Sequence, residues 1–401
     1  MAASIKHIVT LMMSNRSFDH MLGALKEQDP RINGLTGEES NPDATNKLIR
    51  VQPLAAYQGQ LSPNPAHDFA GVNLQLYFGT RGSPEIPTMQ GFIKSYFEQR
   101  RDVSHSHNIM YYFTPEKLPV LTTLASNYAV FNGWFSSIPG PTLCNRGFSH
   151  YGTSFGQVGV NSFFSAGQYL SIYERMLKAG RTAKVYYFDE QSSSLEVSNL
   201  LNNQPHLFGS YTDFLIDCKS SRLPDYCFVE PNYSDHEDDG GGKLLASDQH
   251  PDHHVLAGEA FIGSVYNAIR NNPNLWKNTL LLITYGEHGG IYDHVPPPTC
   301  TPDGFEASGE ATGTGFPFKF DRLGVRVPAI AISPWIPKGT VVPGPGEQNG
   351  RTFEHASIPA TVTKYFLGDY DHRSPREKAA STFMDLISDQ MRPDADCPYF
   401  R

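Results

Sequence analysis

The chain has 401 residues, of which 39% are hydrophobic and 12% aromatic, a composition typical of a folded globular protein. Its formal net charge is −9 at pH 7, so a broad basic surface for nucleic acid is not expected. No apolar run approaches the roughly 20 residues needed to span a bilayer, and a strand is predicted within a few residues of the start, so we expect no signal peptide and a cytoplasmic or otherwise intracellular protein.

Strand-like segments, rich in apolar and β-branched residues, recur along the chain. The first, residues 5–13, and a later one, residues 280–285, have the pattern of buried strands and both end abruptly in polar turns. Further strands are predicted at residues 128–135, 183–188, 224–231 and 327–332.

Helical patterns lie between these strands. They are predicted at residues 91–108, 118–125, 169–180 and 258–271, and from residue 353 onward. Strands that alternate with helices indicate an α/β fold with a mostly parallel central sheet covered on both faces.

Three long loop insertions interrupt this alternation, at about residues 30–66, 232–254 and 299–322, and the tail from Arg392 is expected to be irregular. We expect one domain over residues 1–401. The five cysteines are an odd number without a C-x-x-C pair, which favours reduced thiols, with a Cys218 to Cys227 disulfide as the alternative.

Polar residues follow three of the predicted strands at the point where each strand ends. Asn15 follows the first strand, Thr142 comes after a loop stiffened by Pro139 and Pro141, and Glu287 follows the strand at 280–285. Ligands of open α/β sheets bind at the carboxyl ends of the strands, so these residues are predicted to form one site from distant segments.

The residue types at these positions suit phosphoryl transfer. That chemistry needs a nucleophile, cations to neutralise developing charge and an acid for the leaving group. A threonine hydroxyl, an oxygen-rich metal position and several histidines provide such a set. The candidates are Asn15, His67, Thr142, Arg146, His250, Glu287, His294 and His355.

Several segments resemble the phosphoesterase family that contains bacterial and plant non-specific phospholipases C and the related acid phosphatases. They occur in the family's order between residue 5 and about residue 366. The segments are IKHIVTLMMSNRSFDHMLG, LPVLTTLASNYAVFNGWFSSIPGPTLCNR, DQHPDHHVLAGEAFIGSVYNAIRNNP, LLLITYGEHGGIYDHVPPP, RLGVRVPAIAISPW and FEHASI. The resemblance implies a three-layer α/β/α sandwich of the alkaline-phosphatase-like type and hydrolysis of phosphate esters, with a small-molecule or phospholipid substrate.

The resemblance also implies roles for individual residues. Thr142 matches the nucleophilic hydroxyl, and Asn15 and Glu287 match positions at a divalent metal. His67 and His250 match histidines that contact phosphate or protonate the leaving group. The remaining matches, which with Asn15 are predicted to bind substrate, are Arg146, His294 and His355.

This chain departs from the family pattern at two carboxylate positions. Ser14 stands where the family usually has Glu, and Gly286 stands where it usually has Asp; Asn132 and Cys144 are further departures. Hard divalent cations prefer charged oxygen ligands, so we expect the metal to be weakly bound or absent.

Each assignment has a structural alternative. Asn15 and Ser14 could cap the helix that follows, Arg146 could pair with an internal carboxylate, and His294 and His355 could orient other groups. The histidines of the acidic loop, His236, His253 and His254, could form an incidental metal cluster.

The departures also leave two alternatives to a phosphate-ester hydrolase. One is a metal-independent member of the family that uses its histidines for a lyase, isomerase or transferase reaction in the same pocket. The other is a non-catalytic binding protein.

Overall fold

A sheet of eight strands runs through the centre of the computed structural model, which describes residues 5–79, 87–162, 167–197, 204–237 and 241–400. The strand order is β13-β4-β12-β11-β1-β8-β6-β7. The strands are β1 (His7–Met13), β4 (Ala129–Phe131), β6 (Ala183–Tyr187), β7 (Phe208–Ser210), β8 (Tyr226–Glu230), β11 (Thr279–Tyr285), β12 (Ala329–Ile332) and β13 (Thr340–Val342).

Most neighbouring strands are parallel, which confirms the predicted α/β class. β1 pairs in parallel with β11 on one side and β8 on the other, while β12 runs antiparallel to both β11 and β4. Every residue of β11 is buried, as expected for a strand covered on both faces.

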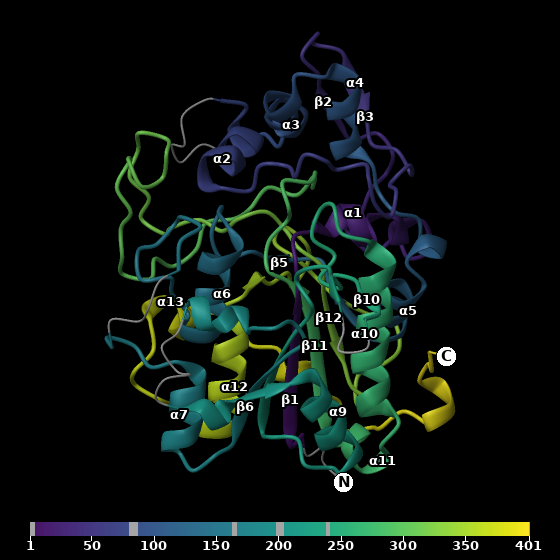
Figure 1. Ribbon diagram of the computed structural model, residues 1–401, viewed down its shortest axis with the longest axis vertical. Coiled ribbons are helices and arrows are strands. Elements are labelled where there is room, and N and C mark those ends of the chain that lie inside the picture. Colours follow the sequence, from purple (N-terminus) through teal and green to yellow (C-terminus); the bar gives the residue numbers. More distant parts are fainter. Residues whose placement is uncertain (1–4, 80–86, 163–166, 198–203, 238–240, 401) are drawn as a thin grey trace.

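Two groups of helices cover the sheet from opposite sides (Figure 1). One group contains α6 (Thr142–Tyr151), α7 (Ile172–Lys178), α12 (Ser357–Leu367) and α13 (Pro375–Ala379). The other contains α5 (Pro119–Asn127), α9 (Tyr211–Lys219), α10 (Val255–Arg270) and α11 (Pro273–Trp276). No helix among the described residues is long and apolar enough to cross a membrane.

A cap of short elements lies beyond the carboxyl end of β1, at the top of Figure 1. It contains α1 (Phe18–Leu22), α2 (Phe69–Tyr77), α3 (Phe92–Arg100), α4 (Val103–Ser106), β2 (Ser40–Pro42) and β3 (Leu48–Arg50). The predicted insertion at 30–66 therefore contains a small hairpin of β2 and β3. Its Ile49 and Val51 belong to a hydrophobic cluster with the helices of the cap.

Three other predictions differ in detail from the structure. The predicted strand at 128–135 is two strands, β4 and β5 (Trp134–Phe135), because Gly133 packs directly against Gly344 and Pro345 at the break. Phe353 begins β14 (Phe353–Glu354), which pairs with β5 before α12 starts. The loop at 232–254 contains the short pair β9 (His236–Glu237) and β10 (Lys243–Leu244). All five cysteines are free, so the alternative disulfide is not formed.

The pairing of β1 with β11 aligns the two strand ends that carry the predicted site. Met13 is opposite Tyr285, and the Gly286 N–H donates to the Met13 carbonyl at 2.9 Å. Residues 14–15 and 286–287 therefore leave the sheet side by side.

The N-terminus of α5 is capped by a carboxylate from another helix. Leu118, the N-cap residue, offers no side-chain hydrogen bond, and Glu259 of α10 accepts from the Val120 N–H at 2.7 Å and the Leu121 N–H at 3.3 Å. Burial raises the pKa of Glu259 to about 7, although these two N–H groups favour the charged form.

Glu259 should make the stability of the protein depend on pH. Between its ordinary pKa of 4.5 and its folded pKa of about 7, the folded protein holds a proton that the unfolded chain has released. The free energy of unfolding should therefore fall, by about 3 kcal/mol, as pH rises through this window. Urea unfolding of the wild type and Glu259→Gln at both ends of the window isolates this contribution, and equal pH dependence in the two proteins would contradict it.

Candidate functional site

Asn15 and Thr142 bring the end of β1 into contact with the start of α6. The Thr142 hydroxyl donates to Asn15 Oδ1 at 3.0 Å, and Asn15 has a left-handed φ of 55°. A Cβ atom on Gly286 would lie 3.4 Å from Thr142 Cγ2. The three segments that the sequence predicts to form one site therefore do meet in the structure.

Thr142 is the first residue of α6, where the sequence had predicted only a polar turn. The N-cap residue Pro141 makes no side-chain hydrogen bond to the helix. The N–H groups of the first helical turn are therefore not capped by its side chain. The loop before the helix is fixed by Asn145, which accepts from the Ile138 N–H at 3.1 Å and donates to the Gly140 carbonyl at 2.9 Å. This arrangement holds the threonine at a helix end that attracts anions.

Arg146 lies one turn further along α6 and is completely buried. Its Nη1 is 3.4 Å from Glu230 Oε1, and its guanidinium lies over the ring of Tyr233. Its Nε and Nη2 have no hydrogen-bond partner. Arg146 thus forms the internal ion pair that was its alternative role and still has two donor nitrogens, Nε and Nη2, available for an anion.

A pocket of about 350 Å³ opens over these residues, and we call it the Thr142 pocket. It contains residues from the end of β1, the start of α6 and the loop after β8. Its lining residues are Ser14, Thr142, Leu143, Arg146, Ser193, Tyr233, Asp248, His250 and His253.

Three histidines form a row beside the Thr142 pocket. The ring centroids of His67 and His250 are 5.6 Å apart, and those of His250 and His253 are 5.5 Å apart. His67 Nδ1 bonds to the Pro65 carbonyl at 2.8 Å, so its Nε2 is directed elsewhere. Burial lowers the pKa of His250, although the nearby Asp248 opposes the shift. The neutral form of His250 can accept a proton.

Glu287 is a buried carboxylate with one unused oxygen. Its Oε2 accepts from the Gly289 N–H at 2.7 Å, and its Oε1 has no hydrogen-bond partner. Burial opposes its ionisation, but His67, His288 and the Gly289 N–H together lower its pKa below the usual range. An anionic Glu287 therefore stands next to the histidine row.

Neither His355 nor His294 lines the Thr142 pocket, and Asn15, His67 and Glu287 are not among its lining residues either. The substrate-binding roles of His355 and His294 stay predictions. His355 is buried behind the turn after β11, where its Nε2 bonds to the Gly286 carbonyl at 2.7 Å and Trp134 Nε1 is 3.4 Å from its Nδ1. These bonds suit a residue that positions the turn. Burial lowers its pKa to about 4.

His294 belongs to a separate network of buried charges. Its Nδ1 is 2.7 Å from Asp19, and Arg326 bonds to Asp19 at 2.8 Å and to Asp293 at 3.1 Å. Within the described residues, Asp19, Asp293 and His294 are the one group of three or more metal-type side chains close enough to share an ion. Arg326 already supplies the positive charge there, so the group is an ion-pair network.

The predicted metal position has few suitable donors. Asn15 Oδ1, Thr142 Oγ1 and Glu287 Oε1 lie at this position, and the first already accepts from the second. Ser14 and Gly286 contribute no carboxylate, and Asp248, the carboxylate on the wall of the Thr142 pocket, is bonded to His253. One free carboxylate does not fit a tightly held hard divalent cation, which prefers six or more oxygens, several of them charged.

Six residues of the Thr142 pocket were not among the predicted site residues: Ser14, Leu143, Ser193, Tyr233, Asp248 and His253. Asp248 and His253 flank His250 in the D-x-H-P-x-H segment, and that spacing was the signal available. Ser193 and Tyr233 follow β6 and β8, and no motif marks them.

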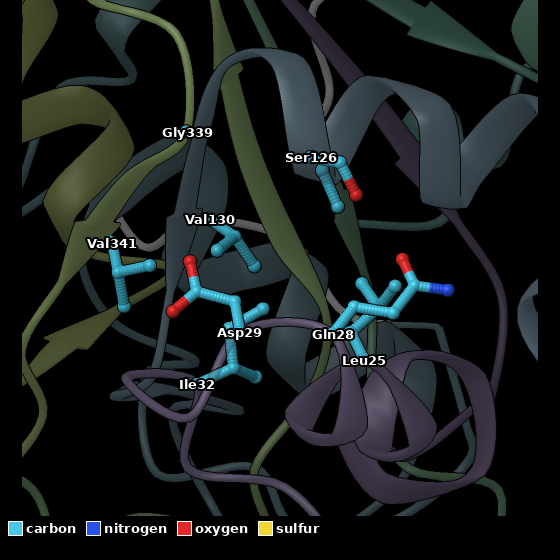
Figure 2. A pocket seen from close by; sticks show the side chains of 9 residues that line it. Leu25, Gln28, Asp29, Ile32, Ser126, Val130, Gly339 and Val341 are labelled. Carbon is cyan, nitrogen blue, oxygen red and sulfur yellow. The ribbon is translucent and has the colours of Figure 1, made fainter.

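A second cavity, of about 220 Å³, lies at the edge of the sheet (Figure 2). Residues from the short helix Gly23–Glu27, α5, β4 and β13 line it, among them Leu25, Ile32 and Val130. It shares no lining residue with the Thr142 pocket. None of its lining residues has a buried side-chain nitrogen or oxygen without a hydrogen-bond partner.

Comparison with known proteins places these features in a family. The model of the phosphoesterase family matches residues 5–367. Non-specific phospholipase C1 of Arabidopsis thaliana is 40% identical over 407 residues, which cover 98% of this chain and 73% of the relative. Phospholipase C A of Mycobacterium tuberculosis is 25% identical over 393 residues, which cover 82% of this chain and 68% of the relative.

Among solved structures, a protein in the alkaline phosphatase superfamily from Vibrio parahaemolyticus aligns with a TM-score of 0.42 and 10% identity, over 98% of this chain and 74% of that one. The family model covers most of the chain, and the Arabidopsis relative is similar over nearly all of it. The chain belongs to the phosphoesterase family.

Proposed function

We propose that this phosphoesterase hydrolyses phosphodiesters of the phospholipid type, with Thr142 as the nucleophile. The observation that carries the proposal is the Thr142 hydroxyl, held by Asn15 at the start of α6 in a pocket that also contains unpaired N–H groups of Arg146. The relatives named as phospholipases C support the substrate class. Membership in a family of phosphate-ester hydrolases does not favour the non-hydrolytic alternative.

The positive end of α6 and Arg146 together form a binding site for the phosphate. Helix N-termini favour anions, and a buried guanidinium with two free donors can bond two phosphate oxygens. Both groups also face the negative charge that develops on those oxygens as the reaction proceeds. Because the Arg146 guanidinium is buried, its contacts with a phosphate are stronger than they would be in solution.

Thr142 is oriented for attack by its hydrogen bond. Its hydroxyl donates to Asn15 Oδ1, which leaves the lone pairs of Oγ1 available to the pocket. Attack forms a bond between Oγ1 and phosphorus, and the bond from phosphorus to the leaving oxygen breaks. The hydroxyl proton passes to a pocket histidine, and water then hydrolyses the phosphorylated Thr142. His250, beside His67, is the proposed proton acceptor.

We also propose that this chain holds no tightly bound divalent cation at the site. Glu287 is the carboxylate with a free oxygen beside Asn15 and Thr142, since Asp248 is bonded to His253, and Arg146 and the end of α6 supply positive charge around the phosphate.

Removal of the Thr142 hydroxyl should abolish hydrolysis. Thr142→Val keeps the size of the side chain, and we expect kcat/KM for an aryl phosphodiester to fall by at least about 10³-fold. Thr142→Ser, which keeps a hydroxyl, should retain measurable activity. Acid-quenched wild-type enzyme should contain a phosphorylated peptide with the modification on Thr142, detected by mass spectrometry. Undiminished turnover by Thr142→Val would refute the role.

Carboxylates at positions 14 and 286 should create a cation site. The Gly286 Cα faces Thr142 with room for a Cβ, and Ser14 lines the pocket, so the double variant Ser14→Glu/Gly286→Asp adds two charged donors beside Glu287. After dialysis against chelator and reloading, elemental analysis should find about one equivalent of divalent metal in the double variant and far less in the wild type. Adding Glu287→Gln should remove that metal again. A stoichiometric metal in the wild type would contradict the proposal.

A further inference from the structure

Asp248 and His253 form a carboxylate–histidine pair on the wall of the Thr142 pocket. Asp248 Oδ1 lies 2.7 Å from His253 Nδ1 and also accepts from the backbone N–H of His250 at 3.2 Å. The short contact to a carboxylate places a proton on Nδ1. The other ring nitrogen, Nε2, is therefore the atom that His253 can use in the pocket it lines.

The pair is anchored to the end of β1. The Ser14 N–H donates to the Asp248 carbonyl at 2.8 Å, and Arg16 Nε donates to the Gln249 carbonyl at 2.6 Å. The Asp248 side chain is 3% exposed, whereas that of His253 is 33% exposed. A fixed, buried carboxylate thus holds an imidazole that solvent and substrate can reach. A histidine that only filled the core would be buried and would not present its ring to a pocket.

Neighbouring charges favour a proton on His253 more than on His250. The hydrogen bond to Asp248 and the charges of Asp248 and Asp235 raise the pKa of His253, although burial and Arg16 oppose the shift. Burial lowers the pKa of His250. The pKa values of two imidazoles with ring centroids 5.5 Å apart are therefore shifted in opposite directions, which suits an acid and a base at one reaction centre.

We propose that His253 is a second catalytic histidine, which protonates the leaving oxygen from Nε2, and that Asp248 is its positioning residue. The inference rests on the proposed function and deepens it. The geometry also separates the roles of the histidines, because Asp248 bonds to the ring of His253 but to the backbone N–H of His250.

The assignment balances the protons in both steps. In the first step, Thr142 Oγ1 bonds to phosphorus and its proton passes to His250. The electron pair of the breaking bond goes to the leaving oxygen, which takes the proton of His253. In the second step, water attacks phosphorus and gives a proton to His253, while Thr142 Oγ1 leaves with its electron pair and regains the proton from His250. Both histidines return to their starting states.

A substrate needs this acid only if its leaving group is a poor one. An alkoxide from a glycerol-type alcohol must be protonated as it departs, whereas 4-nitrophenolate is stable without a proton. His253→Gln should therefore lower kcat/KM by about 10²-fold for an alkyl phosphodiester, but by much less for the matching 4-nitrophenyl phosphodiester. His254→Gln is the matched control, since the neighbouring His254 stacks on Tyr57 and does not line the pocket.

Asp248→Asn provides a second readout. The groups that set the charge at His253 are Asp248, Asp235, Arg16 and His250. If His253 acts as an acid, activity on the alkyl substrate falls as pH rises through its pKa. Loss of the Asp248 charge should shift that alkaline limb to lower pH by about one unit.

The outcomes separate this inference from the proposed function. Equal losses on both substrates in His253→Gln, or an unshifted alkaline limb in Asp248→Asn, would overturn the inference. If Thr142→Val were inactive at the same time, the proposed function would still stand. A fully active Thr142→Val would refute the proposed function directly. If His253→Gln fails to fold, judged by thermal melting, the pH profile of Asp248→Asn decides.

Discussion

The parallel pairing of β1 with β11 is the constraint on which the site depends. Because Met13 is opposite Tyr285, Asn15 and Glu287 emerge at the same edge of the sheet. A shift of this pairing by one residue would displace Asn15 relative to Glu287. The register of β1 with β11 therefore determines whether the two polar turns emerge together.

Buried ion pairs hold the loops that follow these strands. Arg326 joins Asp19, after β1, to Asp293, after β11, and it also lies over the ring of Phe18. Such pairs contribute little net stability compared with an apolar core, but removal of one partner leaves an uncompensated charge and costs about 3–5 kcal/mol. Their consequence here is geometric, since they fix where the two polar turns stand relative to each other.

Several buried polar atoms near Thr142 have no hydrogen-bond partner. Asn15 Nδ2, Arg146 Nε and Nη2, and Glu287 Oε1 are buried and have no hydrogen-bond partner. Buried polar groups nearly always have a hydrogen-bond partner. Groups without one in and beside the Thr142 pocket are therefore suited to bind a ligand. Among these groups Arg146 carries a positive charge and Glu287 a negative one, and serine and glycine at positions 14 and 286 add no further negative charge.

The sequence by itself determined the class of the fold and the residues at the strand ends, because apolar runs that stop at polar turns are visible in the chain. Its motifs, through their resemblance to the phosphoesterase family, indicated the family and predicted Thr142, Asn15 and Glu287 as site residues. Only the tertiary structure decided that Thr142 begins a helix, that His355 and His294 do not line the pocket, and that His253 lies on its wall beside His250. These facts depend on which distant segments pack together, and a single segment does not encode the partners that its side chains will meet.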